Sequence, residues 1–131
     1  MFANAYKGRR VFVTGHTGFK GSWLAAWLTQ MGAVVGGFSD CVPTTPSHYA
    51  AMDLGAHLEA DMRGDIRDRE GMIKAMRQFQ PDVVFHLAAQ ALVRKSYDDP
   101  AMVRAMPAAA ISVMRSCSTR TAVTTVTTGT R

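Results

Sequence analysis

The glycine-rich segment from Val11 to Gly21 most constrains the fold of this chain. It reads VFVTGHTGFKG: a short apolar run, three glycines spaced G-x-x-G-x-x-G, and the start of a helical pattern. Glycines permit the tight turn and close backbone approach that a phosphate group needs. The unpaired amides at the start of the following helix attract the negative charge of that phosphate. The segment therefore predicts a phosphate-binding loop between a buried strand and a helix.

Short apolar runs elsewhere in the chain predict further strands of the same sheet. Residues 10–13, 33–38 and 83–88 are rich in valine and phenylalanine, which is typical of parallel strands covered on both faces. Residues 64–66 are expected to end another strand, and residues 123–128 have β propensity. With helices between the strands, this order predicts an α/β fold: a truncated, Rossmann-like doubly wound parallel sheet of about four to five strands.

Two segments have the spacing of amphipathic helices. In residues 19–31 the large apolar side chains recur at intervals of three and four, so we expect Trp23 and Trp27 to pack in the core. Gly32 is expected to end this helix. A second helix is expected over residues 69–79, with the aspartate before it as the N-cap.

The charge is unevenly distributed along the chain. The net charge is +5, yet residues 1–100 carry eleven basic and ten acidic residues, whereas residues 101–131 carry four arginines and no acid. Because no stretch combines clustered basic residues with aromatic ones, we expect no nucleic-acid binding. The last 31 residues are also rich in threonine and hold Pro107 within a helical pattern, so we predict a shifted or prematurely ended reading frame there.

The cysteines and the hydropathy pattern indicate the cellular compartment in which the chain is expected. Cys41 and Cys117 lack the spacing of a metal site or of a disulfide framework. No apolar stretch reaches the ~20 residues of a membrane span, and residues 1–10 do not resemble a signal peptide. We therefore expect a cytoplasmic chain with neither a metal ion nor a membrane partner.

Three motifs resemble those of the extended short-chain dehydrogenase/reductase superfamily: T-G-x-x-G-x-x-G from Thr14, G-D-I from Gly64 and H-x-A-A from His86. Their longer forms, together with P-T-x-P-S from Pro43, are similar to the CDP-glucose 4,6-dehydratase family over roughly residues 6–100. The resemblance implies an NAD-dependent lyase that removes water from CDP-glucose, in lipopolysaccharide sugar biosynthesis, and a homodimer at full length. Residues 1–100 would form the NAD-binding segment and residues 101–131 an atypical threonine-rich basic tail.

The resemblance also implies which residues contact the cofactor and the substrate. Asp65 would accept a hydrogen bond from the adenine amino group, Arg94 would contact a substrate phosphate, and Thr128 would match the catalytic hydroxyl. The full set of implied cofactor contacts is Gly15, Thr17, Gly18, Phe19, Lys20, Gly21, Asp65, Ile66, Leu87, Ala88, Ala89 and Gln90.

Some positions depart from the family pattern. The acidic residue that contacts the ribose hydroxyls aligns with Cys41, one position after Asp40, which leaves both NAD and NADP open. Gly129 and Thr130 stand where the family has aspartate and lysine, and the 131 residues contain no Tyr-x-x-x-Lys pair. We therefore expect no turnover from this chain alone. The alternatives are a non-catalytic dinucleotide-binding remnant, or another NAD(P)-dependent sugar-nucleotide epimerase or dehydratase.

Several of these residues have a structural alternative. His16 is either a turn residue or a cofactor contact, and Lys20 is either near the phosphates or a solvated helix residue. Asp65 is either the adenine ligand or a turn former before a helix. His86 is expected to be a buried strand-end histidine with no acid or base role.

Overall fold

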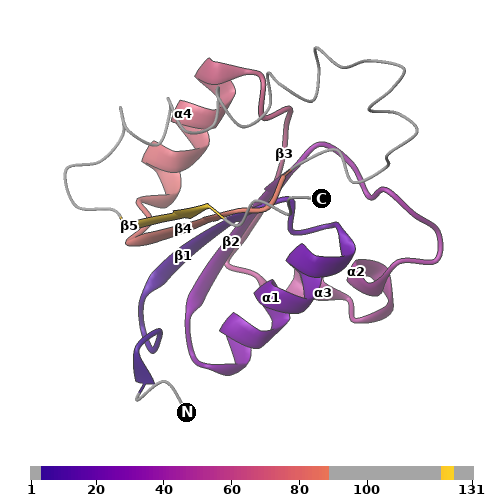
Figure 1. Ribbon diagram of the computed structural model, residues 1–131, viewed down its shortest axis with the longest axis horizontal. Helices are drawn as coiled ribbons and strands as arrows, with labels where there is room; N and C mark the ends of the chain where they lie inside the picture. Colours follow the sequence, from indigo (N-terminus) through magenta and orange to yellow (C-terminus); the bar gives the residue numbers. More distant parts are fainter. Residues whose placement is uncertain (1–3, 89–121, 126–131) are drawn as a thin grey trace, which may run out of the picture.

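The computed structural model describes residues 4–88 and the strand 122–125, and these residues form an all-parallel sheet covered by helices (Figure 1). The sheet has five strands in the order β3-β2-β1-β4-β5, with every neighbouring pair parallel. This is the strand order of a doubly wound dinucleotide-binding sheet, so the predicted fold class is confirmed. The strands are β1 Arg10–Thr14, β2 Val34–Ser39, β3 Ala60–Arg63, β4 Val83–His86 and β5 Ala122–Thr125.

Helices cover both faces of this sheet, as parallel strands require. On one face lie α1 (Phe19–Gln30), α2 (His48–Ala51) and α3 (Leu54–His57), and on the other lies α4 (Arg69–Phe79) (Figure 1). None of the helices within residues 4–88 has the length and apolarity that crossing a membrane requires.

Strand β1 lies at the centre of the sheet and contributes to two apolar clusters. Val11 and Val13 pack with α1 on one face, while Phe12 points to the other face and packs with α4. Successive side chains of a strand point to opposite faces, so a continuous apolar run is what a strand covered on both sides needs. All three side chains are fully buried.

The helix ends follow the sequence signals. Gly32 adopts φ +80°, and the amides of Gly32 and Ala33 donate to the carbonyls of Thr29 and Leu28, at 3.0 and 3.1 Å. This is a Schellman motif, in which glycine avoids the strain of a left-handed residue. The Asp68 carboxylate accepts a hydrogen bond from the Gly71 amide at 3.1 Å and caps α4. Both helix-end predictions are confirmed.

The expectation that Trp23 and Trp27 lie in the core is wrong. Their side chains are 53% and 47% exposed, and they line an apolar hollow of about 470 Å³ on the outer side of α1 together with Leu24, Ala26, Gln30 and Met52. The buried residues of α1 are mostly small instead: Gly21, Ser22, Ala25, Ala26 and Leu28. Small side chains let this helix lie close to the sheet, which leaves the bulky indoles at the surface.

Other predicted boundaries shift by a few residues. The strand expected to end over residues 64–66 ends at Arg63 and is followed by a turn, and β4 ends at His86, two residues before its predicted end. The strand predicted over residues 123–128 corresponds to β5, of which the structure describes Ala122–Thr125. The helical pattern that contains Pro107 lies outside the described residues.

Candidate functional site

The glycine loop connects the end of β1 with the start of α1 at the carboxyl edge of the sheet. Gly15 follows the last residue of β1 with φ +75°, which favours glycine. The Gly15 amide donates to the Phe38 carbonyl of β2 at 2.8 Å, and the Gly18 amide donates to the Gly15 carbonyl at 3.2 Å. Gly18 is the N-cap of α1 and has no side chain to satisfy the first amides of that helix.

Two of the three glycines, Gly15 and Gly21, allow close contacts that a larger residue would prevent. A Cβ on Gly21 would lie 2.0 Å from the Gly15 carbonyl oxygen, and a Cβ on Gly15 would lie 2.8 Å from the amide nitrogen of Ala88. A Cβ on Gly18 would meet the same carbonyl at 3.4 Å, an ordinary contact. The loop therefore brings the ends of β1 and β4 and the first turn of α1 together. This geometry fits a bound phosphate group.

The segment after β4 lies directly against this loop. The Leu87 amide donates to the Thr14 carbonyl at 3.1 Å, and the Ala88 amide donates to the Thr14 hydroxyl at 3.3 Å. The structure thus brings Leu87 and Ala88 together with Gly15, and their contact with the cofactor stays a prediction. The predicted contacts Ala89 and Gln90, with Arg94 and Thr128, lie outside the described residues.

His86 is buried at the end of β4, as expected. Its Nδ1 lies 2.6 Å from the Thr14 hydroxyl, which already accepts from the Ala88 amide. Thr14 therefore links the ring of His86 to the backbone of the segment after β4. Burial lowers the pKa of His86 below its ordinary 6.5 and favours its neutral form.

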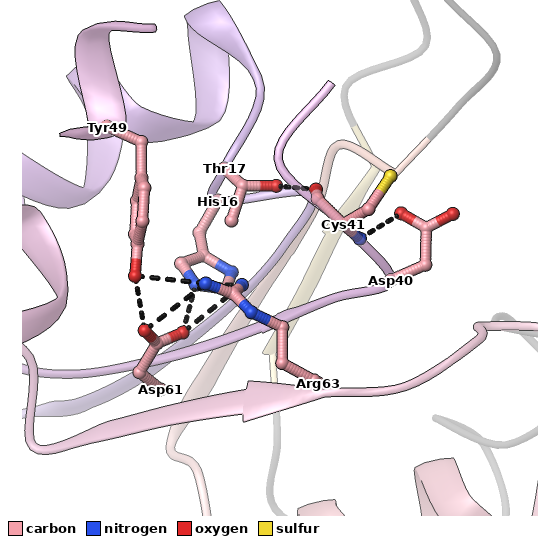
Figure 2. Close-up of polar contacts among 7 residues, drawn as sticks. All are labelled: His16, Thr17, Asp40, Cys41, Tyr49, Asp61 and Arg63. Atoms are coloured by element: carbon pink, nitrogen blue, oxygen red, sulfur yellow. Dashed lines mark hydrogen bonds and ion pairs between the residues drawn. The ribbon is translucent and has the colours of Figure 1, made fainter. Parts of the chain in front are cut away.

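The loop after β2 is tied to the glycine loop on its other side. The Thr17 hydroxyl donates to the Cys41 carbonyl at 2.6 Å, and the Asp40 carboxylate accepts from the Cys41 amide at 2.7 Å (Figure 2). Asp40 is exposed and directly follows β2. Of the two candidates for contacting the ribose, Asp40 thus provides an accessible carboxylate at the edge of the sheet.

Asp65 forms the turn between β3 and α4. Its carboxylate accepts hydrogen bonds from the Arg67 amide at 2.8 Å and from the Arg67 Nε at 2.9 Å. These hydrogen bonds lower the pKa of Asp65 below its ordinary 3.8. The turn-forming alternative therefore describes Asp65 in this structure, and contact with adenine stays a prediction. Ile66 is buried in the apolar cluster beside α4, whereas Phe19 and Lys20 are exposed in the first turn of α1.

His16 lies in the turn between β1 and α1, as one of the two alternatives predicts, and contact with a cofactor stays a prediction. Its ring is fully buried, and its Nε2 lies 2.7 Å from the Asp61 carboxylate of β3 (Figure 2). Tyr49 and Arg63 complete this group, since both hydrogen-bond to Asp61. The sequence interpretation missed these three residues. The signal available was the alternation of Asp61 and Arg63 with apolar residues, which places both side chains on one face of a strand.

The parallel sheet and its glycine loop define a Rossmann-type dinucleotide-binding fold. Residues 12–128 match the family model described as GDP-mannose 4,6 dehydratase, and the chain belongs to this family of nucleotide-sugar enzymes. This result confirms the resemblance drawn from the motifs.

Individual relatives agree with the family match. The chain is 53% identical over 97 residues to the CDP-glucose 4,6-dehydratase of Salmonella typhimurium, a match that covers 74% of the chain and 27% of that protein. It is 35% identical over 91 residues to the UDP-glucose 4-epimerase of Mycolicibacterium smegmatis, a match covering 70% of the chain and 28% of that protein. The chain thus spans about a quarter of the length of these curated relatives.

Solved structures of epimerases share the fold. The UDP-glucose 4-epimerase of Stenotrophomonas maltophila, solved with bound NAD, matches with a TM-score of 0.69 and 25% identity, over 83% of this chain and 34% of that one. The UDP-glucose 4-epimerase of Thermus thermophilus, solved as a complex with NAD, matches with a TM-score of 0.67 and 29% identity, over 82% of this chain and 34% of that one.

Proposed function

We propose that this chain binds NAD at its glycine loop and forms the cofactor-binding part of a nucleotide-sugar 4,6-dehydratase that acts on CDP-glucose. The observation that carries the proposal is the close approach of Gly15 to Gly21 and to Ala88, which holds the start of α1 against the ends of β1 and β4, where the first helix amides would meet a pyrophosphate. The 53% identity to a CDP-glucose 4,6-dehydratase supports the substrate. NAD bound in two of the solved relatives supports the cofactor.

The residues around the loop have the chemistry that NAD needs. The first amides of α1 would hold the pyrophosphate, and the positive charge of the exposed Lys20 would partly neutralise the negative charge of the pyrophosphate. Thr17 would fix the loop through its bond to Cys41, and Asp40 would accept from the ribose hydroxyls. Asp65 would accept from the adenine amino group once its carboxylate turns from Arg67.

The other predicted contacts complete the proposed site. Leu87 and Ala88, with Ala89 and Gln90 beyond the described residues, would lie along the nicotinamide half of the cofactor. When bound, NAD would supply the hydride acceptor that makes loss of water from the sugar possible. Arg94 and Thr128 keep their proposed roles toward the substrate phosphate and the reacting sugar. We place this chemistry in the cytoplasm and in lipopolysaccharide sugar biosynthesis.

Thermal unfolding in the presence of NAD or NADP tests the binding step. A ligand that binds only the folded chain stabilises it by about 2.7 kcal/mol at a concentration 100 times its dissociation constant. We expect NAD to raise the melting temperature more than NADP does, because a carboxylate such as that of Asp40 repels a ribose phosphate. Absence of any shift at saturating NAD would refute the proposal.

Turnover separates the dehydratase from the epimerase alternative, which the 35% identity to a UDP-glucose 4-epimerase favours. The chain, alone and joined to the remainder of its Salmonella relative, is incubated with CDP-glucose and with UDP-glucose. We expect the joined protein to convert CDP-glucose to the 4-keto-6-deoxy product and the chain alone to convert neither. Epimerisation of UDP-glucose by the joined protein would instead favour the second function.

A further inference from the structure

The side chain of His16 occupies a specific buried site beneath the glycine loop. It occupies the first variable place between Gly15 and Gly18, yet its ring is fully buried and reaches toward β3 (Figure 2). Gly37 of β2 provides the space, because a Cβ there would lie 2.3 Å from Cγ of His16. The Tyr49 ring also packs against the imidazole, nearly perpendicular to it, with ring centroids 5.7 Å apart at an interplanar angle of 80°.

The hydrogen bond between His16 and Asp61 has a defined donor. A carboxylate can only accept, so the Nε2 of His16, 2.7 Å from Asp61 Oδ1, carries the hydrogen and donates it. Burial lowers the pKa of His16 below its ordinary 6.5, although Asp61 acts in the opposite direction. The groups that face the imidazole are Asp61 and Arg63 from β3 and Tyr49 from α2. The ring is therefore neutral at neutral pH, and its one donor points at Asp61.

Asp61 is itself held in place from other directions. The Tyr49 hydroxyl donates to Oδ2, and Arg63 Nη1 lies 3.3 Å from Oδ1. Arg63 Nη2 also donates to the Tyr49 hydroxyl at 3.0 Å. Burial raises the pKa of Asp61, but the hydrogen bonds from Tyr49 and His16 and the nearby Arg63 outweigh it, and the net pKa lies below the ordinary 3.8. Asp61 is thus a fixed, charged acceptor.

We propose that His16 is a positioning residue that fixes the glycine loop to strand β3 through its Nε2–H bond to Asp61, and that NAD affinity depends on this bond. The inference rests on the proposed function. Gly15 and Thr17, on either side of His16, belong to the backbone that would surround the pyrophosphate. A hydrogen bond to a charged group such as Asp61 is worth on the order of 10- to 100-fold in an equilibrium constant, so a side chain that holds the loop in this way controls binding without touching the ligand.

Paired variants test whether the bond itself matters. His16→Gln keeps an amide donor near the place of Nε2, whereas His16→Leu keeps an apolar side chain without a donor. Asp61→Leu removes the acceptor. His57→Leu is the matched control, because His57 is an exposed histidine at the end of α3. Far-UV circular dichroism establishes folding, and calorimetric titration measures NAD affinity in each variant.

We expect His16→Leu and Asp61→Leu each to weaken NAD binding on the order of 10- to 100-fold, the value of a lost hydrogen bond to a charged group, with His16→Gln and His57→Leu close to wild type. Amide hydrogen exchange of residues 15–18 is measured on the same proteins without NAD. We expect exchange in the loop to accelerate in His16→Leu and Asp61→Leu and to stay slow in His16→Gln. Rescue by glutamine distinguishes an anchoring hydrogen bond from mere filling of space.

The outcomes separate this inference from the proposed function. If wild type shows no NAD binding, the proposed function fails, and loop exchange alone decides whether His16 anchors the loop. Wild-type affinity and wild-type loop exchange in a folded His16→Leu or Asp61→Leu protein would overturn the inference. Failure of both variants to fold would overturn it as well, because the bond would then support the whole fold rather than the loop.

Discussion

Gly15 and Gly8 allow backbone strain to be separated from close packing. Both have a positive φ, +75° and +72°, so alanine at either position pays a similar left-handed strain of about 1 to 2 kcal/mol. A Cβ on Gly8 would meet no atom within 4 Å, whereas a Cβ on Gly15 would lie 2.8 to 2.9 Å from backbone atoms of Leu87 and Ala88. Backbone atoms cannot rotate away, so we expect a further loss of about 1 to 3 kcal/mol for Gly15→Ala from overpacking.

Urea unfolding followed by circular dichroism measures this difference. The smaller entropy of an unfolded chain with alanine favours both variants by a similar amount and cancels in the comparison. We expect Gly8→Ala to lower the free energy of unfolding slightly and Gly15→Ala to lower it clearly more. Equal losses in the two variants would refute the argument that approach of the segment after β4 requires a glycine at position 15.

Three further predictions follow from the packing and the charges. Burial lowers the pKa of both His16 and His86, so below about pH 6.5 the unfolded chain binds more protons than the folded chain does. The free energy of unfolding should therefore fall as the pH is lowered from that value, by up to about 1.4 kcal/mol per pH unit for each histidine. A urea midpoint that stays unchanged on acidification would contradict this. Trp23→Ser should lower the free energy of unfolding by about 1 kcal/mol, because the indole is 53% exposed and stacks on the His48 ring with centroids 4.0 Å apart. A loss of about 3 to 5 kcal/mol in urea unfolding, as for a core tryptophan, would contradict its surface position. Asp68→Ala should lower the free energy of unfolding by about 1 kcal/mol, because the α4 cap is lost. Asp68→Asn is the control that keeps an acceptor. Equal stability of the two variants would exclude a capping role.

The glycine loop and the helix ends could be predicted from the sequence because local chemistry determines them. A positive φ at Gly32 and a carboxylate cap at Asp68 act within a few residues of each helix end. The orientation of α1 could not be predicted in the same way. Apolar residues occur all around that helix, so periodicity did not show which side faces the sheet. The small residues Gly21 and Ala25, one turn apart, mark the buried side.

The partners of His16 could not be predicted from local chemistry. Asp61 lies 45 residues further along the chain, and the two meet only because β3 pairs with β2 at the edge of the sheet. The sequence showed a histidine between two glycines and an aspartate in a loosely patterned segment, with no signal that joined them. Sheet order, which depends on packing across the whole domain, brings them into contact.

The adjacent glycines of β2 connect the core with the glycine loop. Glycine weakens a strand, so two in succession indicate close approach from both faces. A Cβ on Gly36 would lie 2.7 Å from the Phe79 ring of α4, and a Cβ on Gly37 would lie 2.3 Å from His16. We therefore expect Gly36→Ala to displace α4 and lower the free energy of unfolding by about 1 to 3 kcal/mol, with little change in loop exchange.

Gly37→Ala should have the complementary effect. The added methyl group pushes against His16, and because Asp61 is held by Tyr49 and Arg63, the loop rather than the carboxylate must move. We expect amide exchange of residues 15–18 to accelerate and NAD affinity to fall, as in His16→Leu. Identical effects of Gly36→Ala and Gly37→Ala on loop exchange would contradict the idea that the two glycines have different roles. One cause, loss of packing in the sheet, would then explain both effects. A selective effect of Gly37→Ala would instead show that Gly37 supports the loop while Gly36 supports the packing of α4.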